Sequence, residues 1–358
     1  MRTFTFLGGS SLAAGLVSMY ILAMTGFNIW KPRILVVHSF SESSQQVKEI
    51  DGGMKEKLRL NRLPVSVQWY YLNSDKPDLD AMTNSEITNI SRVIDDFNPS
   101  CMILVDDRAN HLMALSPILR RNRRIFFLGI NQPPSVFGYR EGDPVAGIAD
   151  VAPHQSLLEL LENIRGGTNL RITVLGSDTD LGRDLGATFE SRPLGTNRIR
   201  GVHYASTWTQ WQRIVQQSNQ DSDILLITAL HGLRDGRNGQ VVPTEKVVKW
   251  TEVEAKRLQP IGLTFDYVPL GGSLSVVPSA YYRGAMAMDS VLRWSEPSRK
   301  NAMPTFSLDD HFDVGMRIER LKQRGITLPL IYREAARLSK QLYSLDSQDH
   351  RVEDREFR

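Results

Sequence analysis

The hydrophobic positions of this chain fall into short apolar runs separated by longer stretches with helical periodicity. The first series begins after residue 32, and its runs are apolar on both faces of an extended strand. Buried runs that alternate with helices predict a parallel sheet covered on both sides. The expected strands are 33–37, 65–71, 101–105, 124–128 and 145–149, and the expected helices are 45–60, 84–97 and 110–120.

The same pattern restarts after residue 155, and Gly166 and Gly167 end its first helix. Two successive series of similar size predict an α/β protein with two tandem doubly wound parallel-sheet lobes. In this second series the expected strands are 171–175, 199–204, 224–228 and 261–264, and the expected helices are 156–164, 181–190, 210–217, 244–257 and 280–293.

The N-terminal segment differs from the rest because no charged residue lies between Arg2 and Lys31. A helix of about 20 apolar residues can cross the hydrocarbon layer of a membrane. The sequence around Ala23 matches an Ala-x-Ala cleavage site poorly, which favours an uncleaved transmembrane helix over a cleaved signal peptide. The expected divisions are a membrane anchor or signal segment at 1–32, an N-terminal lobe at 33–151, a C-terminal lobe at 152–306, a crossover and C-terminal helical segment at 307–345, and a charged tail at 346–358.

Composition narrows the possible functions. Among 358 residues, 41% are hydrophobic and 23% are charged, which is ordinary for a globular protein. The net charge of +3 is too small, and the basic residues too scattered, to indicate a nucleic-acid partner. Cys101 lies in an apolar run and is expected to be a buried strand residue. The seven histidines show no ligand spacing, so we expect neither a metal site nor a cofactor.

Polar and small residues gather where the expected strands end. Ligands of doubly wound sheets bind at the carboxyl ends of the strands, so two facing lobes predict a shared cleft that closes by hinge motion. Asp178 and Asp180 would repel a phosphate and would suit a cationic group such as an amine. Phe40, Trp208 and Tyr267 offer aromatic surface for stacking. The alternative role for each polar residue is a helix cap or a turn.

No group of residues has the spacing of a catalytic site. His38 and Ser39 are adjacent on a strand and therefore point to opposite faces. Asp106 and Asp107 are explained by a turn after a strand, and the chain has no glycine-rich phosphate loop. We therefore predict no catalytic residue and a protein that is not an enzyme. A two-lobed enzyme such as a glycosyltransferase is the less favoured alternative, because aspartates stand where such an enzyme would need a basic or glycine-rich phosphate site.

Several short segments resemble a known family. They are the strand and turn at 33–40, the segments 103–109 and 125–131 with their polar ends, and the Gly-Gly strand at 270–275 with the glycine-containing helix start at 283–285. Over about residues 33–324 the chain resembles the ABC-transporter substrate-binding-like family, which has the type I periplasmic binding protein fold and also serves as extracytoplasmic sensor domains.

This resemblance implies reversible binding of an amino-acid-like or other small polar solute, which the protein would present to a membrane permease. The alternative is a membrane-anchored sensor that signals to a separate membrane protein, and the absence of a lipobox cysteine favours that alternative. Either function implies a single-pass protein of the cytoplasmic membrane with its globular part in the periplasm or outside the cell. The implied ligand contacts are Ser39, Phe40, Asp107, Asn131, Asp178, Asp235 and Gly272.

Overall fold

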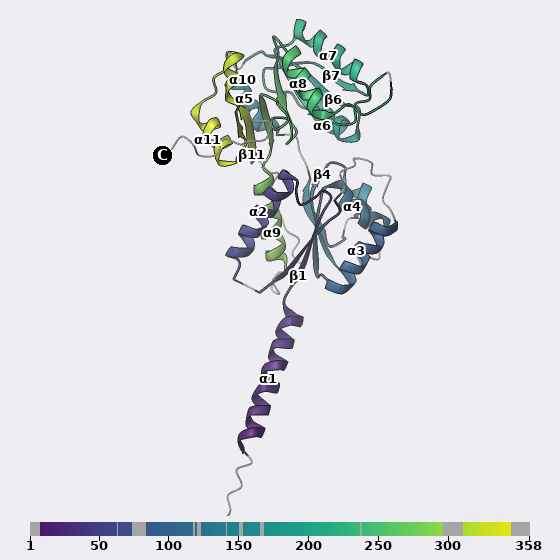
Figure 1. Cartoon of the computed structure of the whole chain (residues 1–358), viewed down its shortest axis with the longest axis vertical. Coiled ribbons are helices and arrows are strands. Elements are labelled where there is room, and N and C mark those ends of the chain that lie inside the picture. The colour runs from purple at the N-terminus through teal and green to yellow at the C-terminus, as the bar shows by residue number, and fades with distance from the viewer. Residues whose placement is uncertain are drawn as a thin grey trace, which may run out of the picture.

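The computed structural model contains two α/β lobes and a helix that projects from the base of the first lobe (Figure 1). It describes residues 8–62, 64–73, 84–116, 119, 123–140, 142–149, 153–164, 168–236, 238–295 and 311–344. The expected α/β class with parallel sheets is confirmed.

The first lobe has a five-stranded parallel sheet with the strand order β2-β1-β3-β4-β5. Its strands are buried on both faces: Ile34 and Val36 belong to one core cluster, and Leu35 and Val37 belong to another on the opposite face. This two-sided burial explains the continuous apolar runs in the sequence. The elements are β1 (Arg33–His38), α2 (Gln45–Leu60), β2 (Ser66–Tyr71), α3 (Asn84–Phe97), β3 (Cys101–Val105), α4 (Asp106–Leu115), β4 (Arg124–Ile130), η3 (Pro134–Phe137) and β5 (Val145–Ala149).

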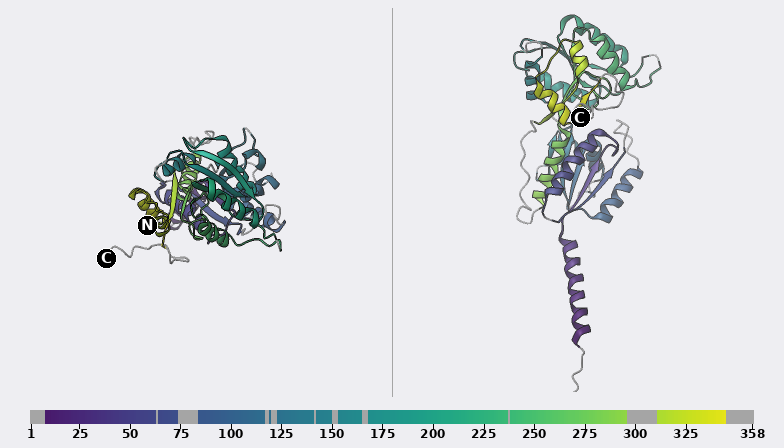
Figure 2. Two further views of the ribbon diagram at one scale, coloured as in Figure 1. Left: turned by 90° about the horizontal axis from the view of Figure 1, so that it is seen from above. Right: turned by 60° about the vertical axis from the view of Figure 1, so that its left-hand side comes forward.

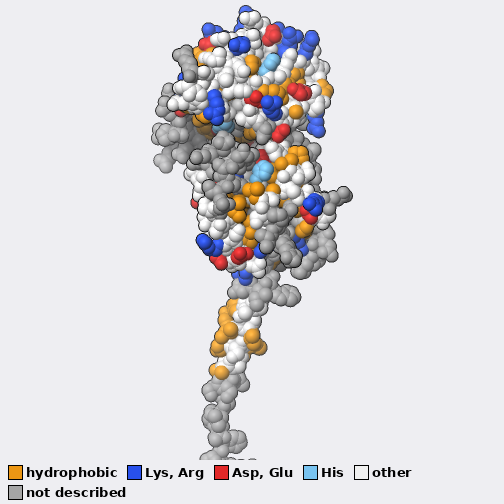
Figure 3. All heavy atoms as spheres, turned by 90° about the vertical axis from the view of Figure 1, so that its right-hand side faces the viewer, with side chains coloured by type: hydrophobic (Ala, Val, Ile, Leu, Met, Phe, Trp, Pro, Cys, Tyr) orange, Lys and Arg blue, Asp and Glu red, His pale blue; other side chains and the backbone are white. Residues whose placement is uncertain are grey.

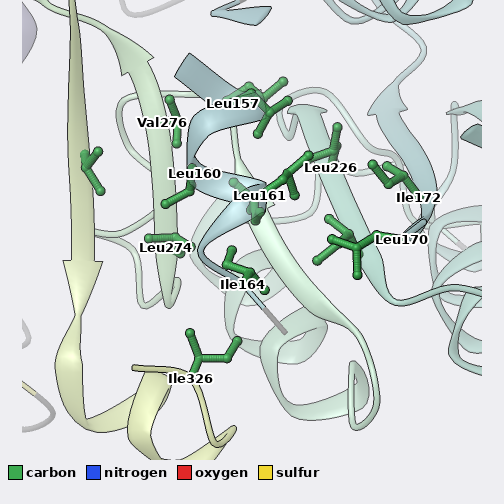
Figure 4. Packing of buried hydrophobic residues seen from close by; sticks show 14 of the residues in the cluster. Leu157, Leu160, Leu161, Ile164, Leu170, Ile172, Leu226, Leu274, Val276 and Ile326 are labelled. Atoms are coloured by element: carbon green, nitrogen blue, oxygen red, sulfur yellow. The ribbon is translucent and has the colours of Figure 1, made fainter. Parts of the chain in front are cut away.

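The second lobe has a seven-stranded sheet with the order β12-β11-β10-β9-β8-β6-β7, in which β11 runs antiparallel to β10. Its core includes Leu157, Leu160 and Leu161 of α5, which lie against the sheet residues Leu226 and Leu274 (Figure 4). The elements are α5 (His154–Glu162), β6 (Arg171–Ser177), α6 (Asp180–Ser191), β7 (Arg198–Ala205), α7 (Trp208–Asp221), β8 (Ile224–Ala229), α8 (Thr244–Glu254), β9 (Gln259–Gly262), β10 (Leu274–Pro278), β11 (Phe312–Arg317), α10 (Ile318–Gln323), α11 (Leu330–Leu338) and β12 (Leu342–Tyr343).

Helix α9 (Ala280–Trp294) follows β10 of the second sheet but packs on the first sheet. Its residues Met288 and Val291 share a core cluster with Ile34, and α9 lies beside α2 (Figures 1 and 2). This helix falls within the range 152–306 that the sequence assigned to the second lobe. The chain therefore passes between the lobes three times, after β5, after β10 and after α9.

The expected positions of these crossovers can be compared with the structure only in part. The crossover expected at Ser273–Val277 is displaced, because most of that segment belongs to β10 and the passage to α9 follows it. Val151, near the first expected crossover, and Ser307, near the third, lie outside the described residues.

Two glycines allow α2 and α9 to approach backbone to backbone. A Cβ atom on Gly53 of α2 would lie 1.9 Å from the carbonyl oxygen of Tyr281, and a Cβ on Gly284 of α9 would lie 2.1 Å from that of Ile50. Both distances are far below van der Waals contact, so the sequence needs glycine at both positions for this packing.

Helix α1 (Gly8–Trp30) precedes the first lobe. Apolar atoms are visible on its surface (Figure 3), and its exposed large apolar residues are Leu16, Val17, Met19, Tyr20, Ile21, Leu22 and Met24. Within the described part of the chain, no helix has both the length and the hydropathy needed to cross a membrane. The transmembrane helix expected at this position stays a prediction.

Candidate functional site

The carboxyl edges of the two sheets face each other. Strand β10 ends at Pro278, directly before α9, which packs on the first lobe. Strands β9, β8, β6 and β7 run parallel to β10, so their carboxyl ends share its direction. In the first lobe, β1 starts next to α1 and runs toward the second lobe (Figure 1). The strand-end residues where the two lobes meet form the candidate site (Figure 1).

At the first edge, two of the expected ligand contacts bind each other. The backbone N–H of Asn131 donates to Oδ1 of Asp107 at 2.9 Å, and its side-chain Nδ2 donates to Oδ2 at 2.8 Å. Asp107 lies in the first turn of α4 and Asn131 directly follows β4. The strand-end argument put both residues at this end of the sheet, and the structure shows that they also bind each other there.

Ser39 and Phe40 follow β1 but occupy different environments. The buried hydroxyl of Ser39 donates to the carbonyl of Val105 at 2.7 Å and accepts from the backbone N–H of Ala109 at 3.0 Å. Ser39 therefore connects β1 to β3 and α4 and does not present its hydroxyl to a ligand. Phe40 is 40% exposed, so its ring is available at the edge as expected.

Asp106, also at this edge, was not among the ligand contacts expected from the sequence. It lies between Val105 and Asp107 with a φ of +67°, in the left-handed region, where a residue other than glycine costs about 1–3 kcal/mol. Its Oδ2 atom is out of contact with solvent and accepts no hydrogen bond from the described residues. Burial raises the pKa of Asp106 to about 7; the charge of Arg283 on α9 opposes this shift and the charge of Asp107 adds to it.

A buried network lies on the α2 side of the same edge. Nε2 of His38, at the end of β1, and Oδ1 of Asp51 on α2 are 2.9 Å apart. The Tyr71 hydroxyl donates to Oδ2 of Asp51 at 2.7 Å, and the Tyr71 ring stacks on His38. Burial opposes ionisation of Asp51, but the hydrogen bonds from His38 and Tyr71 and the charge of Lys55 outweigh it and lower its pKa. His38 is thus directed to Asp51, away from Ser39, as strand alternation predicts.

At the second edge, Asp178 already has two partners. The Ser206 hydroxyl donates to its Oδ2 at 2.8 Å, and its Oδ1 lies 2.5 Å from Arg183 Nη2 in an ion pair without hydrogen-bond geometry. The Arg183 side chain is 60% exposed. Thr179 caps α6 by accepting from the backbone N–H of Gly182, so the capping role considered for Asp178 belongs to its neighbour.

Asp235 lies in the loop after β8, close to the start of α7. Its backbone N–H donates to the carbonyl of Gln240 at 2.8 Å, and the adjacent Arg234 donates its N–H to the carbonyl of Ser206 at 3.2 Å. Because Ser206 also binds Asp178, the two expected contacts Asp178 and Asp235 lie in one group of loops.

Gly272, Tyr267 and Trp208 lie in the core of the second lobe. A Cβ atom on Gly272 would lie 2.3 Å from the Tyr267 ring, so packing of that ring accounts for the glycine. Tyr267 is fully buried and donates its hydroxyl to Glu252 at 2.8 Å, while Trp208 packs edge-on against Trp250. The expected stacking of a ligand on Tyr267 or Trp208 does not fit this burial.

The sequence did not predict the pair formed by His231 and Asp266. Nε2 of His231, two residues beyond β8, lies 3.0 Å from Oδ2 of Asp266, which follows β9. Nδ1 of His231 lies 3.0 Å from the hydroxyl of Thr244 at the start of α8. The hydrogen bond with Asp266 raises the pKa of His231, and burial opposes it. The sequence signal that could have identified this pair is that the two residues follow the adjacent strands β8 and β9.

Among the described residues, no cluster of three or more His, Cys, Asp or Glu side chains is placed to hold a metal ion. The first edge provides Asp107, Asn131 and the exposed ring of Phe40, and the second edge provides the charged groups Arg183 and His231. Such a mixture suits binding of a small polar molecule.

Comparisons with known proteins agree with this architecture. No family model matches the chain, and no curated protein matches it in sequence. Among solved structures it is similar to an ABC domain in complex with L-Trp from Streptococcus pneumonia, with a TM-score of 0.55, 14% identity, and coverage of 87% of this chain and 99% of that one. It is also similar to the ligand-free, open structure of a substrate-binding protein with adhesive properties from Clostridium difficile, with a TM-score of 0.59, 14% identity, and coverage of 83% and 96%.

A third similar structure comes from a mutant XylFII–LytSN complex, with a TM-score of 0.51, 11% identity, and coverage of 81% of this chain and 99% of that one. At these identities the likeness concerns the fold. Together with the two opposed carboxyl edges and the three crossovers, it shows that the chain has the two-lobed fold of the type I periplasmic binding proteins.

Proposed function

We propose that this protein is an extracytoplasmic solute-binding protein that closes its two lobes around a small molecule and presents it to an ABC permease. The observation that carries the proposal is the opposition of two carboxyl edges across a hinge of three chain crossings. Lobes joined in this way move as rigid bodies. A molecule that contacts both edges binds the closed form better and shifts the population toward it.

The chemistry of the edges favours a small polar, amino-acid-like solute. Arg183 and His231 of the second lobe are half exposed or more, and each is held by an aspartate. Asn131, Asp107 and the exposed Phe40 all lie at the first edge. The complex of the Streptococcus protein with L-Trp supports the same ligand class.

A sensing role is the second candidate, and the similarity to a structure from the XylFII–LytSN complex supports it. Binding and closure would be the same in both roles, and the output would differ. Cross-linking in cells from the surface of the closed lobes, followed by identification of the bound membrane protein, separates a permease from a signalling protein.

The proposal includes no catalytic step. The Ser39 hydroxyl is occupied by Val105 and Ala109, and the His38 ring is bound to Asp51 on the other face of β1. A nucleophile and its base are therefore not in contact at this edge.

We propose that α1 attaches the protein to the cytoplasmic membrane, with both lobes outside the cytoplasm. The exposed apolar residues of α1, such as Ile21 and Leu22, support attachment, and none of its described residues belongs to the four core clusters. Full-length protein should fractionate with membranes, and protease added to spheroplasts should digest the lobes. Protection of the lobes from that protease would refute this topology.

Solution scattering of residues 33–358 tests the closure mechanism. A ligand identified by a thermal-shift screen against amino acids, sugars, purines and small acids should reduce the radius of gyration. Superimposable curves with and without a ligand that demonstrably binds would refute closure.

A further inference from the structure

A second group of charged residues lies at the edge of the second sheet that is opposite to the candidate site. Strand β11 runs antiparallel to β10 and ends at Arg317, whose backbone N–H donates to the carbonyl of Ser273, directly before β10. Helix α10 follows β11, so it lies where β10 begins and not where β10 approaches the first lobe. A molecule bound beside α10 is therefore separate from a solute held between the lobes.

A cavity of about 190 Å³ lies between α10 and the end of α8. This volume is several times the ~30 Å³ that one water molecule occupies in the liquid, so it can hold a small chemical group. The spacing of Arg320, Gln323 and Arg324 puts them on one face of α10 and of the residue that follows it. The cavity is lined by Glu252, Ala255, Lys256, Arg320, Gln323 and Arg324.

Two of the charged lining residues, Glu252 and Arg324, neutralise each other. The buried carboxylate of Glu252 accepts hydrogen bonds from Arg324 at 2.8 Å and from the backbone and hydroxyl of Ser273 at 2.7 and 2.8 Å. Arg324 also donates to the carbonyl of Glu252 and to two carbonyls just beyond α8, so each of its terminal N–H groups has an acceptor. This pair covers the negative end of α8 and forms a neutral wall.

The other two charged lining residues, Lys256 and Arg320, have no such partners. Within the described part of the chain, neither side chain forms a hydrogen bond or an ion pair, and Nε of Arg320 is shielded from solvent. Burial lowers the pKa of Arg317, and the charge of Arg320 lowers it further, so Arg320 repels the neighbouring cation. The cavity therefore has two positive charges that the protein does not compensate, and a buried N–H donor without an acceptor.

A phosphate group matches this arrangement. It carries a charge of about −1.5 to −2 at pH 7, close to that of two cations, whereas a carboxylate carries a single charge. The planar guanidinium of Arg320 presents its N–H groups in a fork that suits phosphate oxygens, and the ammonium of Lys256 adds a compact charge. The amide of Gln323 offers a neutral donor beside them.

The position of the cavity favours a soluble phosphate compound over a membrane lipid. Helix α10 belongs to the second lobe, and the first lobe lies between that lobe and α1 (Figures 1 and 2). With α1 as the membrane attachment proposed above, lipid headgroups lie at the other end of the molecule.

We propose that the cavity between α8 and α10 binds the phosphate group of a small soluble molecule, with Arg320 and Lys256 as its charged donors. This site gives the protein a second ligand, independent of the solute that binds between the lobes.

The experiment measures binding by calorimetry with full-length protein in detergent, at constant ionic strength and about pH 7.5, where phosphate is mainly a dianion. Inorganic phosphate and glycerol 3-phosphate are the soluble probes, phosphatidic acid in the micelles is the lipid probe, and succinate is a dianion without a phosphate group. The test variants are Arg320→Gln and Lys256→Gln. The matched control is Lys322→Gln, which removes an exposed charge from the same helix but does not line the cavity.

We expect a soluble phosphate compound to bind the wild type more tightly than succinate does. Arg320→Gln should weaken this binding roughly tenfold or more, as for loss of a charge-assisted hydrogen bond, and the exposed Lys256→Gln should weaken it roughly threefold. Lys322→Gln should leave the affinity unchanged. Because Arg320 has no partner to lose, Arg320→Gln should unfold at the same temperature as the wild type or higher, so its effect on binding is not a folding defect.

Absence of binding of both soluble phosphate compounds would overturn the inference. It would also be overturned if Arg320→Gln bound phosphate as the wild type does, if succinate bound equally well, or if Lys322→Gln caused the same loss. Preferential binding of phosphatidic acid would assign the phosphate group to a lipid and overturn the soluble source. All of these results leave solute binding between the lobes to be judged by the scattering experiment.

Discussion

The two sheet edges that face each other are built differently. In the first lobe the polar groups are bound inside the protein: Ser39, Asp51 and His38 are buried, and Asp107 is bonded twice to Asn131. In the second lobe the corresponding groups are ion pairs near solvent, since the side chains of Arg183 and His231 are 60% and 52% exposed.

From this difference we infer that the two lobes contribute to ligand binding in different ways. Side chains held by buried hydrogen bonds are already ordered, so a ligand orders them at little further entropic cost. Exposed long side chains such as Arg183 can change rotamer and adapt to the ligand or to lobe closure. The first edge is therefore expected to fix the position of a solute, and the second to adjust to it.

The largest expected effect comes from breaking the buried network of the first lobe. Asp51→Ala removes the partner of His38, Tyr71 and Lys55, and loss of one member of a buried charged network costs about 3 kcal/mol of unfolding free energy. Urea unfolding measures the loss of unfolding free energy. Relative to the wild type, the variant should exchange its amide hydrogens faster in β1, with less change in β8. A loss below about 1 kcal/mol would show that the network does not stabilise the lobe.

A smaller effect is expected where α9 meets the first lobe. Gly53→Ala places a methyl group 1.9 Å from the Tyr281 carbonyl oxygen, and overpacking of this kind costs about 2 kcal/mol. Gly52→Ala is the matched control, because its nearest contacts are Tyr281 ring atoms at 3.5 Å and alanine favours a helix. Thermal unfolding measures the stabilities of both variants, and equal stabilities would contradict the close approach of α2 and α9.

In the second lobe the corresponding change should matter little for stability. Asp178→Ala removes an exposed ion pair with Arg183 and a hydrogen bond from Ser206, so the unfolding free energy should fall by less than about 1 kcal/mol.

The same residue is also tested for ligand binding. If Asp178 contacts a ligand cation, Asp178→Asn weakens binding of that ligand by about 1.5–3 kcal/mol. Urea unfolding and ligand titration measure the two effects separately, and a large loss of stability would remove the contrast between the lobes.

The smallest expected effect is a difference in pH dependence. The lowered pKa of Asp51 stabilises the folded first lobe above about pH 4, and this contribution is lost as the pH falls through the folded pKa. The raised pKa of His231 stabilises the second lobe below about pH 6.5, and this contribution, less than about 1 kcal/mol because the group is half exposed, is lost as the pH rises.

Unfolding measured from pH 3 to pH 9 tests both signs. Asp51→Asn should reduce the loss of stability on the acid side. His231→Gln should reduce the decline on the alkaline side, and the decline that remains up to about pH 7 comes from Asp106, whose raised pKa also stabilises the folded state at lower pH. If Asp51→Asn changed stability only on the alkaline side and His231→Gln only on the acid side, the proposed difference in pH dependence between the two lobes would be refuted.

The sequence predicted those parts of the fold that depend on local pattern. The strands at 101–105 and 224–228 were predicted within one residue, and those at 124–128 and 261–264 within two, because their apolar runs and flanking turns are local signals. The placement of α9 on the first sheet was not predicted, since its periodicity shows that one face is buried but not which sheet buries it. Gly53 and Gly284 specify the partner, and their effect appears only when the two helices meet.

The candidate site was predicted to a similar extent. Asp107 and Asn131 came together because both follow parallel strands. Gly272 and Tyr267 also lie near strand ends, but the ring fills the space that the glycine leaves. Asp106 differs from Asp107 in its backbone conformation and in the hydrogen bonding of its carboxylate, and neither property can be inferred from two adjacent aspartates.

The position of α9 also determines when the first lobe can be completed during synthesis. One face of its sheet is covered by α2 and by α9, at residues 280–294, so that face stays partly open until most of the second lobe has been made. At about 5–20 residues per second, the chain between residues 149 and 294 takes roughly 7–30 s to emerge. For that interval Ile34, Val36 and their neighbours lack part of their cover, which makes the nascent first lobe a natural client for chaperones.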